Sequence, residues 1–231
     1  RSASFKTSSS SSRRPSRLFA PQLTQASVLR VETCGALLLY RDNGVHFNDT
    51  YTVCYTSNMQ QVIVIHGGTT FEDYDAYLQS LSQKKLDIER FVYKPKWKEL
   101  LQGNLGSEYQ VLTPSMPNST NAQYNEWRLW FDHISSLFTD DCILIGHSLG
   151  AIFLVKYLSE NTLQVKIKAT ILVAAPYDDE TTEDLTDFKI KDIPHRFTEQ
   201  AGRLVFFNGL DDPVISRSDL RKYQQQLPTA E

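Results

Sequence analysis

A serine stands where a strongly apolar strand pattern gives way to a helical one. Cys142-Ile143-Leu144-Ile145 is typical of a buried strand, and Leu149-Gly150-Ala151-Ile152-Phe153-Leu154 begins an apolar helix. Gly146-His147-Ser148 joins the two, so the turn is short and Ser148 lies at its apex. A hydroxyl at such a turn points away from the sheet and lies beside unpaired N–H groups of the helix N-terminus, which suits nucleophilic chemistry.

Gly146 and Gly150 flank this serine in the pattern Gly-x-Ser-x-Gly. Both glycines have a steric reason, because side chains there would collide across so tight a turn around a strained serine. Between a strand and a helix, the pattern is typical of the nucleophile elbow of α/β-hydrolases. The alternative is a turn serine in an ordinary βα unit, since the bare five-residue pattern also arises by chance.

The turn His66-Gly67-Gly68 follows Val62-Ile63-Val64-Ile65, a β-branched run typical of a strand covered on both faces. Acyl transfer by a serine needs donors for the oxyanion, and α/β-hydrolases use the N–H after the nucleophile and one from an earlier loop. Here those groups belong to Leu149 and Gly68. The residues that we expect to line the pocket are His66, Gly67 and His147. Taken alone, the turn also fits a tight βα connection and nothing more.

An acid that orients the catalytic base should follow a later strand, because the chain order in this fold is serine, acid, histidine. The segment Asn208-Gly209-Leu210-Asp211-Asp212-Pro213-Val214 is well placed for it. We assign Asp212 as the orienting acid and keep Asp211 as the second choice. Both aspartates also suit a solvated turn, which is the competing interpretation.

No histidine follows Asp212, where the chain order of this fold places the catalytic base. The histidines are His46, His66, His133, His147 and His195. None of them follows Asp212, and His195, which precedes it, would break the family order as a substitute base. We therefore expect the triad histidine to lie beyond residue 231, together with a last strand and helix.

Alternating strand and helix patterns extend over the rest of the chain from Gln61. Strands are predicted over 62–65, 111–112, 142–145, 170–174 and 204–207, and helices over 71–83, 124–138, 149–160 and 216–227. Ser216 is a plausible N-cap of the last helix, with Asp219 three residues on. The polar stretch 84–109 is expected to be an insertion with Trp97 at helical spacing from two leucines, and 176–200 has no strong period.

This alternation predicts an α/β fold with a doubly wound, mostly parallel sheet. Ligands bind beyond the carboxyl ends of the strands in such sheets, so the loops 66–70, 146–150 and 208–213 should converge at one edge. That convergence does not depend on the serine motif.

Three regions differ in composition. Residues 1–27 are rich in serine and arginine, which favours a disordered tail over an organelle transit peptide. Residues 28–60 are an uncertain extension with possible strands at 36–40 and 51–55. Residues 61–231 form the predicted hydrolase domain, which we expect to be C-terminally incomplete.

The composition narrows the classes of function. The 231 residues include 41% hydrophobic residues and carry a net charge of −3, which indicates a globular domain without an obvious preference for nucleic acid or an anionic membrane. The three cysteines, at 34, 54 and 142, fit no metal site or disulfide framework and favour a reducing, cytoplasmic location. No cofactor or metal is expected, the partner is a small acyl substrate, and nothing indicates the oligomeric state.

Residues 61–231 resemble the small α/β-hydrolases of the retinoblastoma-binding-protein type, also called YdeN-like serine hydrolases. The resemblance rests on six segments: Val64–Gly68, Met116-Pro117-Asn118, Glu126-Trp127, Gly146–Ala151, Leu172–Pro176 and Asp211–Val214. It implies a compact hydrolase with little or no cap, using Ser148, Asp212 and a histidine in a C-terminal Gly-His-Phe-like turn. That turn has no counterpart here.

Two functions remain open on the sequence. The first is a serine hydrolase of carboxylic esters or similar acyl compounds, with weak or no turnover by these 231 residues alone. The second is a non-catalytic binding protein on the hydrolase fold, which the absent histidine and the insertion at 84–109 favour.

Overall fold

The computed structural model describes residues 59–178, 184–209, 211–212 and 214–231. The chain divides into two compact units, Arg1–Thr56 and Ser57–Glu231, and only the second contains described residues. The predicted tail, the strands at 36–40 and 51–55, and all but the last two positions of the extension lie outside the described residues.

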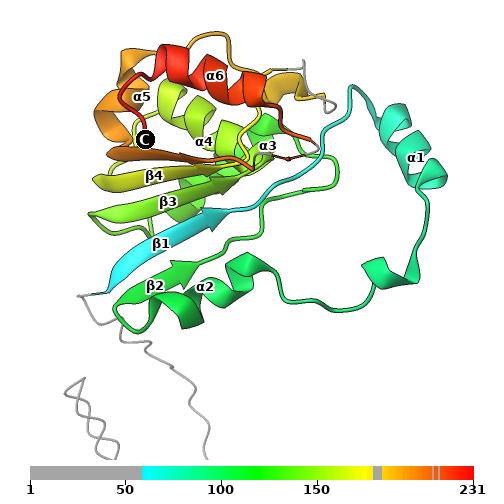
Figure 1. The fold of residues 1–231 in the computed structure, drawn as a ribbon, viewed down its shortest axis with the longest axis horizontal. Helices are drawn as coiled ribbons and strands as arrows, with labels where there is room; N and C mark the ends of the chain where they lie inside the picture. The colour runs from blue at the N-terminus through cyan, green and yellow to red at the C-terminus, as the bar shows by residue number, and fades with distance from the viewer. Residues whose placement is uncertain (1–58, 179–183, 210, 213) are drawn as a thin grey trace, which may run out of the picture. The chain divides into compact units, whose positions relative to one another are not determined.

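Five parallel strands form one sheet in the order β2-β1-β3-β4-β5 (Figure 1). The strands are β1 (Gln60–Ile65), β2 (Tyr109–Leu112), β3 (Cys142–His147), β4 (Ile167–Val173) and β5 (Arg203–Phe207). Parallel neighbours need crossovers, which the helices between the strands supply. The predicted parallel α/β fold is confirmed.

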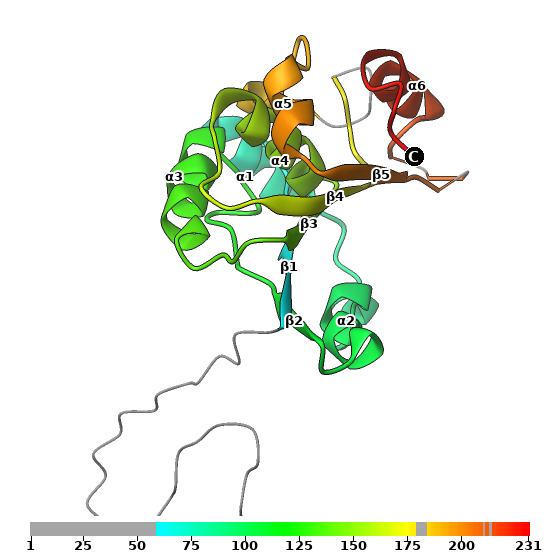
Figure 2. The ribbon, with the colours of Figure 1, turned by 90° about the vertical axis from the view of Figure 1, so that its left-hand side faces the viewer.

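Six α-helices accompany the sheet within the described residues. They are α1 (Tyr74–Gln83), α2 (Trp97–Leu105), α3 (Tyr124–Ser135), α4 (Leu149–Glu160), α5 (His195–Gln200) and α6 (Arg217–Gln226), with short 3₁₀ turns η1 (Ile88–Arg90) and η2 (Thr186–Phe188). Helices α3 to α6 contribute to one apolar core and α2 to a second, so the sheet is covered from both faces (Figure 2).

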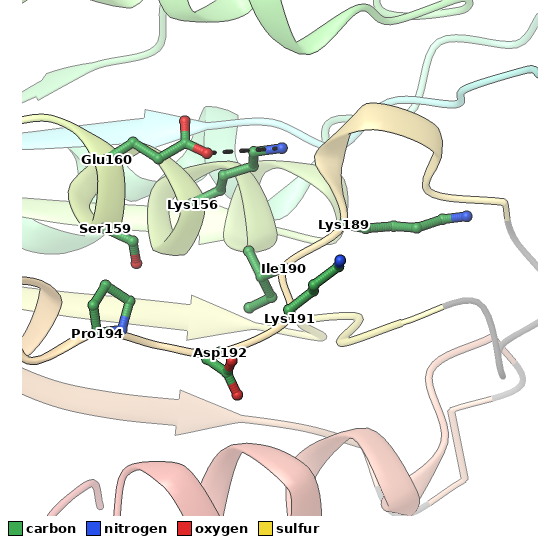
Figure 3. A pocket seen from close by; sticks show the side chains of 8 residues that line it. All are labelled: Lys156, Ser159, Glu160, Lys189, Ile190, Lys191, Asp192 and Pro194. Carbon is green, nitrogen blue, oxygen red and sulfur yellow. Dashed lines mark ion pairs between the residues drawn. The ribbon is translucent and has the colours of Figure 1, made fainter.

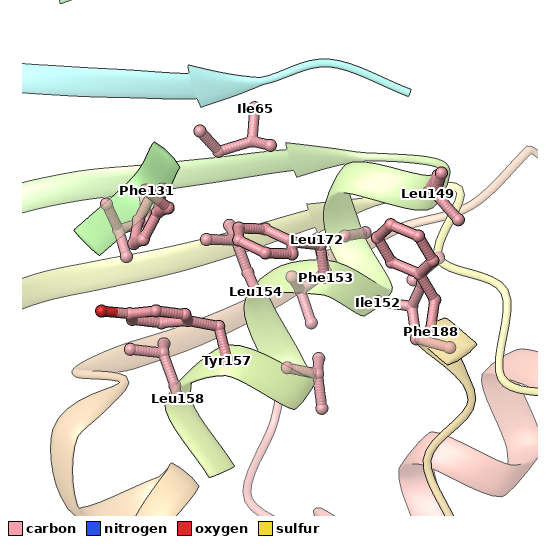
Figure 4. Packing of buried hydrophobic residues seen from close by; sticks show 14 of the residues in the cluster. Ile65, Phe131, Leu149, Ile152, Phe153, Leu154, Tyr157, Leu158, Leu172 and Phe188 are labelled. Carbon is pink, nitrogen blue, oxygen red and sulfur yellow. The ribbon is translucent and has the colours of Figure 1, made fainter. Parts of the chain in front are cut away.

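The larger core is built around α4, of whose 12 residues nine are buried (Figure 4). Phe153 meets the rings of Trp127 and Phe131 at centroid distances of 5.5 and 5.4 Å, edge to face. Phe188 closes this cluster from η2, 5.2 Å from Trp127. Such contacts add to the burial energy of the rings. The helix behind Ser148 is therefore held by packing along most of its length.

The second core is smaller and lies on the opposite face of the sheet. Val62, Val64 and Ile145 are buried there, and Leu101 of α2 packs against them. The side chain of Gln102 ties α2 to β2, because its Nε2 donates to the carbonyl of Tyr109 at 2.9 Å and its Oε1 accepts from the N–H of Val111 at 2.9 Å.

Three helices differ from the sequence prediction. Helix α1 begins at Tyr74 rather than at 71, and the Asp73 side chain caps it by accepting from the N–H of Ala76 at 2.7 Å. Helix α5 lies within 176–200, where no element was predicted, because its six residues bury a single apolar side chain, Phe197, and show no period. Helix α3 ends at Ser135 rather than at 138. The hydroxyls of Ser135 and Ser136 donate to carbonyls three residues back, at 2.8 Å each, and so satisfy acceptors at the end of the helix.

The C-terminal helix begins as predicted. Ser216 caps it, and its Oγ accepts from the N–H of Ser218, while the Asp219 carboxylate accepts from the N–H of Ser216 at 3.1 Å. After α6, the N–H of Glu231 donates to the carbonyl of Leu204, and the N–H of Phe206 donates to the carbonyl of Glu231. This alternation is the hydrogen-bond pattern of a parallel pair, made by a single residue at the outer edge of β5.

Neither a membrane span nor a metal cluster occurs among the described residues. No described helix is long and apolar enough to cross a bilayer, and no group of three His, Cys, Asp or Glu side chains in this part of the chain is arranged to hold a metal. The Cys142 thiol is free and buried at the start of β3, and burial raises its pKa to about 11. A thiol in that state is chemically inert.

Candidate active site

Ser148 occupies the junction of β3 and α4 in a backbone conformation that L-residues rarely adopt. Its φ is 51° and its ψ is −123°. Its N–H donates to the carbonyl of Val173 at 2.9 Å, and its carbonyl accepts from the N–H of Ala151 at 2.8 Å. Strain of this kind costs about 1–3 kcal/mol and persists only where the surrounding structure enforces it. The junction thus holds Ser148 in the strained turn that the sequence pattern predicts.

The two glycines around Ser148 are required by close approach of backbone. A Cβ on Gly146 would lie 2.6 Å from the Cα of Ala151, and a Cβ on Gly150 would lie 2.4 Å from the carbonyl oxygen of Ile65. Real Cβ atoms do not come so near to backbone atoms. The second contact also shows that α4 begins directly against the end of β1, which brings the two glycine-containing turns together.

The turn after β1 lies against the serine. A Cβ on Gly67 would be 3.1 Å from the Cβ of Ser148, and one on Gly68 would be 3.1 Å from the Leu149 side chain and 2.8 Å from the carbonyl oxygen of Ser119. The N–H of Leu149 opens α4 and has no intrahelical acceptor. Gly68 and Leu149, the two residues assigned to the oxyanion, are therefore neighbours beside Ser148.

His66 is held by hydrogen bonds on both ring nitrogens. Its Nε2 accepts from the N–H of Met116 at 2.8 Å, and its Nδ1 lies 2.7 Å from the carbonyl oxygen of Gly67, to which it donates. Burial lowers the pKa of His66, and the charges of Lys98 and Lys96 lower it further. A neutral ring with both nitrogens engaged orients the turn and is not free to act as a base.

A loop that follows β2 supports this turn. The indole N–H of Trp127 donates to the carbonyl of Pro117 at 2.7 Å, and the Asn118 amide donates to Glu126 at 2.9 Å. The N–H of Thr69 then donates to the carbonyl of Ser119 at 2.9 Å. Reasoning from residue chemistry gave these positions no role, although most of them belong to the segments that carry the family resemblance.

Asp212 lies after β5, partly buried in its own turn. Its Oδ1 accepts from the N–H groups of Val214 at 2.9 Å and Ile215 at 3.0 Å, which fixes the carboxylate. Because β3, β4 and β5 are parallel, the turn that carries Asp212 and the turn that carries Ser148 lie at the same edge of the sheet, and the negative charge of Asp212 raises the pKa of His147. Asp211, the second choice, has an exposed side chain.

His147 directly precedes Ser148 and is partly buried. Burial is the main reason that its pKa is lowered, with a further decrease from the charge of Lys98 that exceeds the opposing effect of Asp212. The ring of Trp97 stands edge-on to it, with centroids 6.0 Å apart. This tryptophan at the start of α2 was predicted to be helical, but its position beside the elbow was not.

The other described histidines lie away from the serine. His133 is exposed on α3. His195 is exposed at the start of α5, where its Nδ1 is 3.0 Å from Glu199, and the next residue, Arg196, donates to the carbonyl of Glu160. That carbonyl is at the far end of α4 from Ser148, so the structure does not bring His195 to the elbow. Among the described residues, no histidine is hydrogen-bonded to Ser148 or Asp212.

A cleft of about 410 Å³ lies elsewhere on the molecule (Figure 3). Its lining comes from the second half of α4, including Lys156, Ser159 and Glu160, and from residues 189–194. At 1.5 Å per helical residue, Ser159 is about 16 Å along α4 from Ser148. The cleft is therefore separate from the candidate active site.

Comparison with known proteins identifies related sequences and folds. Residues 93–230 match the model of a family described as serine hydrolase. The solved structure of the ydeN gene product from B. subtilis is similar at a TM-score of 0.54 and 19% identity, over 74% of this chain and 83% of that one. A YdeN-like hydrolase from Pectobacterium atrosepticum gives a TM-score of 0.46 and 16% identity, over 75% and 76%. No curated protein matches the sequence.

Proposed function

Because this chain belongs to the serine hydrolase family, we propose that it cleaves carboxylic esters or similar acyl compounds with Ser148 as the nucleophile. The observation that carries the proposal is the strained Ser148 backbone, with φ of 51°, enclosed by glycines that admit no side chain. Backbone strain of this kind clusters at functional sites, and here it falls on a partly buried serine between two turns.

In the proposed reaction, Ser148 Oγ attacks the acyl carbon and gives up its proton to a histidine. The oxyanion of the tetrahedral intermediate accepts hydrogen bonds from the N–H groups of Gly68 and Leu149, each worth about 2.7–4 kcal/mol in the transition state. The histidine then protonates the leaving alcohol. Water attacks the acyl-serine with the same histidine as base, which releases the acid and restores Ser148.

The orienting acid is Asp212 in this proposal. Its Oδ1 is occupied by two backbone N–H groups, whereas no described residue hydrogen-bonds its Oδ2. The free oxygen suits the Nδ1–H of a histidine. We place that histidine in a segment after residue 231, because the backbone of Glu231 already pairs in parallel with β5 and the carboxyl end of a strand there would lie beside Asp212.

Labelling by a fluorophosphonate tests the nucleophile in the full-length protein, including whatever sequence follows residue 231. We expect labelling of the wild type and of Ser159→Ala, a control on the same helix, and none of Ser148→Ala. Hydrolysis of p-nitrophenyl esters should be lost with the labelling. Unlabelled Ser148 in a folded protein would contradict the proposal.

Two matched variants, Asp212→Asn and Asp211→Asn, test which aspartate orients the catalytic histidine. Asp212→Asn should lower kcat by about 10⁴-fold, as expected when a triad acid no longer holds its histidine in the correct tautomer. Asp211→Asn, which changes the neighbouring exposed carboxylate in the same way, should leave kcat close to the wild-type value. The reverse result would assign the role to Asp211.

The second candidate is a binding protein without catalysis. The observation in its favour is that no histidine of the described residues is hydrogen-bonded to Ser148 or Asp212. It predicts that the full-length protein hydrolyses no ester and that Ser148→Ala leaves ligand binding intact. Turnover that depends on Ser148 would exclude it.

A further inference from the structure

The first turn of α2 lies beside the candidate active site and has no role in the mechanism above. The ring of Trp97 meets that of His147 edge-on at 6.0 Å, and His147 adjoins Ser148 in the chain. Trp97 is 41% exposed, so one part of the indole packs on the elbow and another faces solvent. It therefore offers an apolar wall close to the nucleophile.

Two lysines flank this tryptophan and act on the site from close by. The charges of Lys98 and Lys96 lower the pKa of His66 and also that of His147. Both lysines adjoin Trp97 in the chain, and the ring of Trp97 lies 6.0 Å from that of His147, so Lys96 and Lys98 belong to the turn that borders Ser148.

Lys98 has no partner for its charge among the described residues. It is partly buried, and the neighbouring carboxylate of Glu99 is engaged elsewhere, because its Oε2 accepts from the N–H of Lys96 and from the Tyr93 hydroxyl at 3.2 Å each. By contrast, Lys94 on the same segment forms an ion pair with Glu89 at 3.1 Å. A partly desolvated and unpaired ammonium is costly, and an anionic ligand would relieve that cost.

We propose that Trp97 and Lys98 form a subsite for acyl groups that end in a carboxylate. The indole packs against the methylene chain, and the Lys98 ammonium binds the terminal carboxylate while the ester carbonyl lies at Ser148. A monoanionic group suits the site better than a phosphate dianion, because the negative charge of Asp212 also acts at this edge. This inference rests on the proposed hydrolase function, whose substrate class it narrows.

The test compares two esters that differ only in the terminal group: p-nitrophenyl butyrate and the mono-p-nitrophenyl ester of glutaric acid. In the full-length protein, kcat/KM should be higher for the glutaryl ester. Lys98→Gln should lower the glutaryl-to-butyryl ratio of kcat/KM about tenfold, since it removes one charge-assisted contact. Lys98→Arg, which keeps the charge, should retain most of the preference.

Lys94→Gln is the matched control, because it removes a charge from the same segment at a site with its own partner. Its glutaryl-to-butyryl ratio should equal that of the wild type. An unchanged ratio in Lys98→Gln, or an equal decrease in both variants, would overturn the subsite.

A binding measurement separates failure of the subsite from failure of the proposed function. In Ser148→Ala protein, glutarate should change the tryptophan fluorescence more strongly than butyrate, and Trp97→Phe or Lys98→Gln should abolish the difference. Lys98-dependent binding of glutarate without hydrolysis of either ester would keep the subsite and reject the hydrolase. Hydrolysis of both esters with equal kcat/KM, and no preference for glutarate in binding, would keep the hydrolase and reject the subsite.

Discussion

Helix α4, which follows Ser148, and the segment that carries α1 and α2 differ in how many of their residues are buried. Nine of the 12 residues of α4 are buried, whereas neither α1 nor α2 has a buried residue. Between those two helices, Leu86 and Tyr93 are each 80% exposed. Packing therefore fixes the backbone around Ser148, while the segment beside it is held by few contacts, chiefly those of Leu101 and Gln102. Regions with few buried contacts open at low free-energy cost, so this segment should be the more adaptable of the two.

Two glycine substitutions give the sharpest contrast between these regions. Gly150→Ala should destabilise the protein by about 4 kcal/mol or more, because its Cβ would lie 2.4 Å from the backbone of β1. Gly103→Ala in α2 meets nothing within 4 Å and should stabilise the helix by about 0.5–1 kcal/mol. Urea unfolding measures both. A small loss in Gly150→Ala would show that the elbow is not closely packed against β1.

Leucine truncations test the same comparison through side chains. Leu154→Ala in α4 should cost about 2–5 kcal/mol, as is usual for a fully buried leucine. Leu86→Ala, at an 80% exposed position, should change the free energy of unfolding by less than about 0.5 kcal/mol. Equal losses would mean that residues 84–97 are packed in solution.

Relief of the backbone strain at Ser148 should change the free energy of unfolding by a smaller amount, and in the stabilising direction. Ser148→Gly should stabilise the fold by about 1 kcal/mol while abolishing activity, because glycine adopts a φ of 51° without steric cost. Ser159→Gly on the same helix, where the backbone is helical, should destabilise by about 0.5–1 kcal/mol. Both values come from chemical denaturation. Destabilisation by Ser148→Gly would show that the conformation is not strained.

The smallest expected effect is a pH dependence of the free energy of unfolding, to which Lys98 of α2 contributes through His66 and His147. Burial lowers the folded-state pKa of His66 and His147 below the ordinary value of 6.5. Below pH of about 6.5 the unfolded chain then binds more protons than the native one, so stability is full above that pH and declines as the pH falls toward the folded pKa. Lys98→Gln should raise both folded-state pKa values and lessen the decline. NMR titration of the ring protons measures this shift, and Lys94→Gln provides the reference.

The elbow could be predicted from sequence because its requirements are local. Gly146, Ser148 and Gly150 lie within five consecutive residues, and the apolar runs on each side specify a strand and a helix. The parallel sheet follows from the alternation of such runs, and the capping box of Ser216 and Asp219 is likewise readable from spacing alone.

The rest of the site depends on contacts between distant residues. The approach of Trp97 to His147 joins positions that β2 and α3 separate in the chain, and nothing in their spacing indicates it. The same holds for His66 and Met116. Helix α5 was missed for a different reason, because Phe197 is the one buried residue among its six and the segment has no apolar period. The roles of Ser148, Asp212, Gly68 and Leu149 in catalysis stay predictions until the variants above are measured.

One hydrogen bond of the elbow has a consequence for how the site moves. The N–H of Ser148 continues the β3–β4 ladder through the carbonyl of Val173. The backbone N–H of Ser148 is thus part of the β3–β4 hydrogen-bond ladder. The Ser148 backbone therefore cannot relax through a local fluctuation of the loop. Its amide proton should exchange with solvent only when the whole domain unfolds, as slowly as those of the central strands. A residue held in a strained conformation would then be among the last to open.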